Sequence, residues 1–84
     1  DSSLNAEAKT VIKALGGAEN IETVEACATR LRVAVVDKSK VDKKTLKSLG
    51  AVAVLEVGGG IQAVFGGKAN LFSQEINQIL GKGD

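Results

Sequence analysis

One short stretch of the chain brings a thiol and two guanidiniums close together in sequence. Cys27 is the only cysteine, and Arg30 and Arg32, three and five residues further on, are the only arginines. The remaining cationic side chains are all lysines. Arginine presents a planar fork of donors that grips phosphate bidentately, and nearby cations favour the thiolate, the nucleophilic form of cysteine. This arrangement is suited to phosphoryl chemistry at a cysteine sulfur.

The same stretch also has a plain structural interpretation, in which Cys27 packs in the core and the arginines lie at the surface. Free cysteine is among the most frequently buried residue types, so spacing alone leaves both interpretations open. If Cys27 instead lies at a turn, the hydroxyl of Thr29 and the amides of Ala28 and Thr29 can add donors for an anion. Exposure of the thiol is therefore what distinguishes the two interpretations.

The composition excludes several other kinds of site. Histidine is absent, so the chain by itself has no Ser-His or Cys-His nucleophile pair and lacks the usual zinc ligands. A lone cysteine forms no internal disulfide. The only aromatics are Phe65 and Phe72, and the net charge is +1, which argues against recognition of nucleic acid by stacking or by a broad basic field. No metal or cofactor is expected.

The residues on either side of Cys27 predict a β-hairpin. After the turn, Leu31, Val33 and Val35 alternate with polar or smaller residues, the period of a half-buried strand. A shorter strand over 21–26 precedes it, which puts Cys27 at or beside the tip. Arg30 and Arg32 then share one face of the strand. We expect that face to be uncovered, because burying two guanidiniums would be costly.

The other elements complete one small α+β domain. Apolar spacing predicts helices over about 4–15, 41–49 and 68–80, a buried valine-rich strand over 51–57, and a strand over 61–65. The expected fold is a four-stranded antiparallel sheet made from two hairpins, with three helices on one face, in the order α-β-β-α-β-β-α.

Two polar features outside the hairpin have open interpretations. Gln62 is the only polar side chain inside the fourth strand; it can contribute an amide to the arginine face or simply face solvent. The lysines of the second helix, Lys43, Lys44 and Lys47, are more typical of a solvated face than of a binding site.

Taken together, these stretches resemble a known family. The sequences that carry the resemblance are Asn20-Ile21, Ala26-Cys27-Ala28-Thr29-Arg30-Leu31-Arg32, Val41-Asp42, Leu49-Gly50-Ala51 and Ile61-Gln62-Ala63-Val64-Phe65-Gly66. They are similar to the IIB domain of the glucose/N-acetylglucosamine-type permeases of the bacterial phosphoenolpyruvate-dependent sugar phosphotransferase system. The resemblance spans about residues 5 to 80.

The resemblance implies a specific function. Cys27 would accept a phosphoryl group from a phosphohistidine on a IIA domain and pass it to a sugar bound in a membrane IIC domain, while Arg30 and Arg32 stabilise the phosphoryl oxygens. Residues 1–84 would then be a single IIB domain, part of a longer permease, at the cytoplasmic face of the bacterial cell membrane. Two rival classes stay open: a non-catalytic domain that docks a partner through its arginine face, and a small nucleic-acid binder that uses the second helix.

Overall fold

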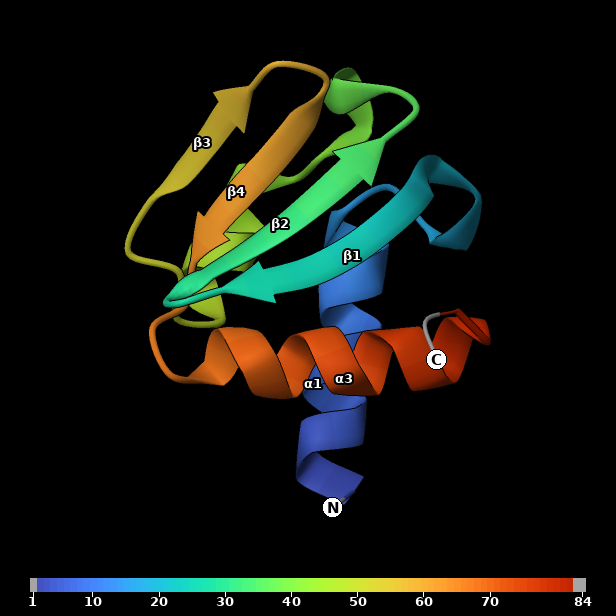
Figure 1. The fold of residues 1–84 in the computed structure, drawn as a ribbon, viewed down its shortest axis with the longest axis vertical. Coiled ribbons are helices and arrows are strands. Elements are labelled where there is room, and N and C mark those ends of the chain that lie inside the picture. The colour runs from blue at the N-terminus through green and yellow to red at the C-terminus, as the bar shows by residue number, and fades with distance from the viewer. Residues whose placement is uncertain (1, 83–84) are drawn as a thin grey trace.

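A computed structural model describes residues 2–82 of the chain (Figure 1). Its elements are α1 (Ser2–Ala14), η1 (Ala18–Asn20), β1 (Ile21–Cys27), β2 (Arg30–Val35), η2 (Lys38–Lys40), α2 (Lys43–Ser48), β3 (Val54–Val57), β4 (Gly60–Val64) and α3 (Lys68–Leu80). The two η elements are single 3₁₀ turns. The order of the helices and strands and the antiparallel pairing confirm the predicted fold class. No helix in residues 2–82 is long and apolar enough to span a membrane.

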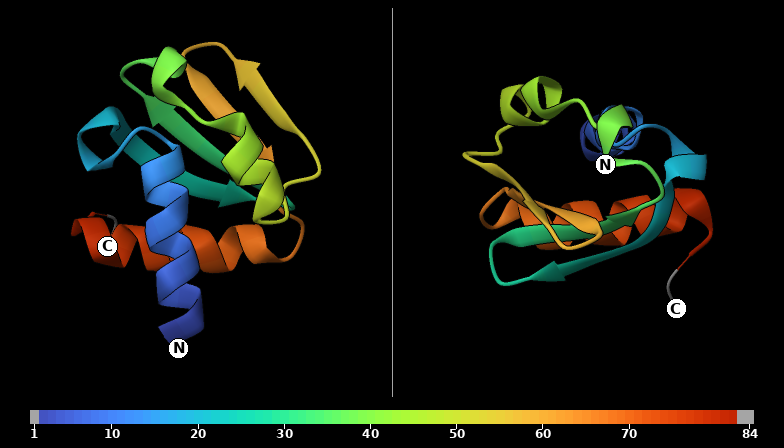
Figure 2. Two further views of the ribbon diagram at one scale, coloured as in Figure 1. Left: turned by 180° about the vertical axis from the view of Figure 1, so that it is seen from behind. Right: turned by 90° about the horizontal axis from the view of Figure 1, so that it is seen from above.

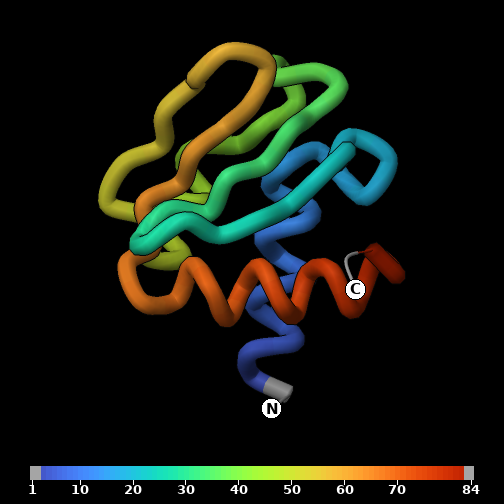
Figure 3. The backbone as a smooth tube through the Cα atoms, in the orientation of Figure 1, coloured from blue at the N-terminus to red at the C-terminus, as the bar shows by residue number. Residues whose placement is uncertain are grey.

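The sheet has the order β1-β2-β4-β3, so β2 and β4 lie in its centre. Seen from above, β1 and β2 lie on one side of the molecule and α1 and α2 on the other, and α3 runs beneath the strands (Figure 2). The backbone trace shows the β1–β2 hairpin tip directly above the start of α3 (Figure 3). One face of the sheet is therefore left without a covering helix.

Alternation along β2 determines which side chains enter the core. Leu31, Val33 and Val35 are buried, whereas Arg30 and Arg32 are exposed on the uncovered face, as the sequence predicted. Phe72 of α3 is part of the buried core. Its ring packs edge-on against the ring of Phe65, with 4.8 Å between the two centroids. Because the apolar side chains of β2 face the core, both arginines extend from the opposite face of the strand.

The prediction of a buried strand over 51–57 was wrong. The strand starts only at Val54 and lies at an edge of the sheet, with Leu55 38% and Val57 50% exposed. Val52, which precedes the strand, is 81% exposed. Leu55 and Val57 stand opposite Gln62 and Gly60 of β4 on the uncovered face. A short apolar run has the same composition at the centre of a sheet and at its edge, so only the pairing order decides its burial.

Asn20 is a buried polar residue that ties the end of α1 to the end of β2. Its side chain is 3% exposed, and its Nδ2 donates to the carbonyls of Leu15 (2.7 Å) and Asp37 (3.0 Å). Its Oδ1 accepts from the amide of Asp37 at 2.8 Å. One buried amide side chain thus bonds backbone groups at both ends of the connection.

Asp42 caps α2 and makes the stability of the domain depend on pH. Its carboxylate accepts hydrogen bonds from the hydroxyl of Thr45 (2.7 Å) and the amide of Thr45 (3.1 Å). These bonds, the hydroxyl first, hold the pKa of Asp42 below its ordinary value. Since the folded pKa is depressed, the stabilisation is present above the unfolded pKa of about 3.9 and is lost as the pH falls through the folded pKa.

We therefore expect the free energy of unfolding to fall on acidification below about pH 4, and to fall less in Asp42→Asn, which cannot titrate. Urea unfolding of both chains at pH 7 and at pH 3 measures this difference. An identical loss in parent and variant would show that the Asp42 cap contributes nothing to the acid response.

Candidate functional site

The site lies at the tip of the β1–β2 hairpin. Cys27 ends β1 and pairs with Arg30, the first residue of β2, so that Ala28 and Thr29 alone make the turn. The Cys27 side chain is free and exposed, which removes the packing interpretation of this residue. The thiol and the first guanidinium thus stand side by side on adjacent strands.

The turn holds an unusual backbone conformation at Ala28. Its φ is 55°, and it is the only non-glycine residue with positive φ in the described part of the chain. A residue with a β-carbon in the left-handed region costs roughly 1–2 kcal/mol relative to the right-handed one. The surrounding structure must therefore hold this turn in place, as strained residues at functional sites require.

The carbonyl of Thr29 provides that hold. It accepts hydrogen bonds from the amides of Phe65 (3.1 Å) and Gly66 (2.9 Å), at the junction of β4 and α3. Gly66 has a φ of 70°, a conformation that glycine adopts without strain. Nothing local in the chain marks Gly66 as a partner of the hairpin tip.

All six residues predicted for the site line one open hollow of about 330 Å³: Cys27, Ala28, Thr29, Arg30, Arg32 and Gln62. Gln62 reaches it because β4 pairs with β2, which places Gln62 opposite Arg32. Its Oε1 accepts a hydrogen bond of 2.9 Å from Nη1 of Arg30. Of its two open interpretations, a place on the arginine face is the one that the structure supports.

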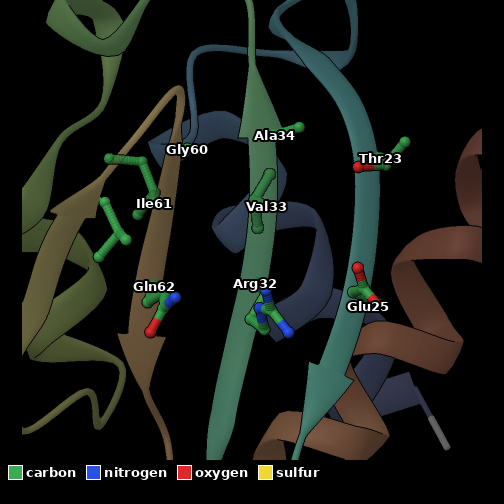
Figure 4. A pocket seen from close by; sticks show the side chains of 9 residues that line it. Thr23, Glu25, Arg32, Val33, Ala34, Gly60, Ile61 and Gln62 are labelled. Carbon is green, nitrogen blue, oxygen red and sulfur yellow. The ribbon is translucent and has the colours of Figure 1, made fainter.

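A second hollow of about 170 Å³ adjoins the first on the uncovered face of the sheet (Figure 4). Arg32 and Gln62 line both hollows. The second also has Thr23 and Glu25 of β1 in its wall, side chains that the sequence did not indicate as part of a site. Only the pairing register of β1 with β2 could have indicated Glu25, because it places this residue directly opposite Arg32.

Comparison with known proteins agrees with this geometry. Residues 9–42 match the family described as phosphotransferase system, EIIB. A crystal structure of one domain of the PTS system IIabc component from Clostridium difficile is similar to the chain, with a TM-score of 0.73 and 26% sequence identity. That match covers 95% of this chain and 81% of the other. The chain is thus similar to the EIIB family of the phosphotransferase system in sequence over residues 9–42 and in fold over most of its length. This confirms the resemblance that the sequence indicated.

Neither of the two arginines is held in an ion pair by the described residues. The ion pairs within residues 2–82 are Lys43–Glu56 at 2.7 Å and Lys68–Glu7 at 3.1 Å, and neither includes an arginine. Over the same residues, no group of three or more acidic, cysteine or histidine side chains is placed to hold a metal ion. The hollow is therefore suited to an anion bound by guanidiniums.

Proposed function

We propose that Cys27 is the phosphoryl carrier of this EIIB domain. It accepts a phosphoryl group from a phosphohistidine on a IIA domain and passes it to a sugar bound in a membrane IIC domain. The observation that supports this most directly is an exposed thiol in one hollow with two arginines that no described carboxylate pairs. Phosphoryl transfer depends mainly on positioning and electrostatic stabilisation, which this arrangement supplies.

Both steps balance without a cofactor. In the first, the sulfur of Cys27 bonds to phosphorus as the nitrogen–phosphorus bond breaks, and the thiol proton ends on the histidine nitrogen. In the second, a sugar hydroxyl oxygen bonds to phosphorus, the sulfur–phosphorus bond breaks, and the hydroxyl proton returns to the thiol. Cys27 is thus regenerated after each turnover, as a covalent carrier must be.

The other residues of the hollow stabilise the transferred group. Arg30 and Arg32 donate to the phosphoryl oxygens, and the hydroxyl of Thr29 and the turn amides of Ala28 and Thr29 add further donors. Gln62 keeps Arg30 in the hollow through the hydrogen bond to Nη1 and offers its own amide nitrogen as a donor. The positive charge is in place before the phosphoryl group arrives, which reduces the reorganisation that transfer requires.

We further propose that residues 1–84 form a single IIB domain of a longer permease. The similar crystal structure is of one domain of a IIabc component. In such a permease the domain works at the cytoplasmic face of the bacterial cell membrane, with IIA and IIC as its partners, and without nucleic acid.

The proposal is tested by incubating the chain with a purified IIA domain that carries ³²P-phosphohistidine. We expect label on the peptide that contains Cys27, located by mass spectrometry, and loss of iodoacetamide alkylation at that thiol in step with labelling. Prior alkylation should prevent labelling. An unlabelled chain that still binds IIA would contradict the proposal and would favour a non-catalytic interaction domain.

A further inference from the structure

The carboxylate of Glu25 is the acidic group closest in register to the proposed phosphoryl site. We infer that Glu25, which stands opposite Arg32 across the β1–β2 pair, is a positioning residue for transfer. It competes with the phosphoryl group for the Arg32 guanidinium and thereby lowers the equilibrium phosphorylation of Cys27. This inference rests on the proposed function and adds a regulator of its phosphoryl equilibrium.

The pairing register places Glu25 beside Arg32. The two residues are directly opposite each other on β1 and β2, and both are exposed. Directly opposite residues of an antiparallel pair extend their side chains on the same face, with Cβ atoms about 4.5–5.5 Å apart. Figure 4 shows the two side chains at the same level on neighbouring strands, in the wall of the second hollow.

The two arginines differ in how they are held. Arg30 donates to Gln62 at 2.9 Å, whereas Arg32 makes no such hydrogen bond and no ion pair within residues 2–82. Glu25 is the only acidic residue in the lining of either hollow, as far as the chain is described. Because both side chains are exposed and stand opposite each other, Glu25 is the carboxylate placed to compete with an incoming anion for Arg32.

Glu25 also acts on the phosphoryl group itself. It lies two residues from Cys27 on the same face of β1, a separation of about 6.5–7 Å along the strand. A phosphoryl group at pH 7 carries a charge of roughly −1.5 to −2. Both groups are exposed, so water and salt screen their repulsion at this separation. Together with competition for Arg32, this screened repulsion corresponds to a change of roughly three- to tenfold in an equilibrium constant.

The experiment measures how phosphoryl groups distribute between a ³²P-labelled IIA domain and Cys27 at equilibrium. We expect Glu25→Gln to raise the equilibrium constant for phosphorylation of Cys27 by roughly three- to tenfold, and to slow onward transfer to sugar. Glu25→Asp keeps the charge and should behave like the parent. Glu22→Gln is the matched control, because it removes the same charge from an exposed position of β1 that lies five residues from Cys27.

A second background tests whether Glu25 acts through Arg32. In an Arg32→Gln chain the effect of Glu25→Gln should shrink, because only direct repulsion remains. An equal effect in both backgrounds overturns the positioning role, as does an unchanged equilibrium in Glu25→Gln when the parent is labelled normally. If the parent itself takes no label on Cys27, the proposed function fails and this inference fails with it.

Discussion

Replacing Cys27 with serine is expected to abolish phosphoryl transfer from IIA to sugar. The serine hydroxyl is weakly nucleophilic unless an adjacent base removes its proton. The chain has no histidine, and the hollow around residue 27 has no carboxylate or lysine in its lining, within the residues described. The arginines stay protonated and cannot act as that base. The assay is sugar-phosphate formation with purified donor proteins and membranes that carry the IIC domain.

The fold should tolerate this substitution. Cys27 is exposed, so Cys27→Ser should unfold at the same temperature as the parent and should still bind phosphorylated IIA. If Cys27→Ser binds IIA but transfers no phosphoryl group, the variant has lost the nucleophile and kept the docking surface. Turnover by Cys27→Ser at a rate near that of the parent would rule out phosphocysteine as the intermediate.

Replacing Arg30 or Arg32 with lysine is expected to slow transfer to sugar by about ten- to hundredfold. Lysine keeps the charge but loses the planar fork, and with it one or two charge-assisted hydrogen bonds in the transition state. Each such bond is worth roughly 1.5–3 kcal/mol, which corresponds to this range of rates. Both arginines are exposed on the uncovered face, so the fold should be unchanged. Transfer rates for the two variants and their thermal unfolding provide the measurement.

A lysine-to-arginine exchange elsewhere supplies the control. Lys44 is exposed on α2, in the helical layer away from the uncovered face, and Lys44→Arg should leave the rate unchanged. If Arg30→Lys and Arg32→Lys both transfer at the parent rate, the site uses the charge of its cations and not their geometry.

The hairpin and the residue types at its tip could be predicted from the sequence because the interactions that form the hairpin are local. Alternation in residues 30–35 assigns Leu31 to the core and both arginines to the open face, since successive side chains of a strand point to opposite sides. Two strands joined by a short link pair with each other, so the sequence placed Cys27 at or beside the turn, where the structure has it. The absence of histidine then limited which chemistry the thiol can perform.

The partners of the tip could be identified only from the tertiary structure. Gln62 meets Arg30 because β4 pairs with β2, and the carbonyl of Thr29 is held by amides of Phe65 and Gly66 from the same distant segment. The order of strands also placed residues 54–57 at an edge, against the prediction of a buried strand. Pairing between segments that lie far apart in the chain depends on how both pack over a shared core, and the hydrophobic pattern of one segment does not specify its neighbour.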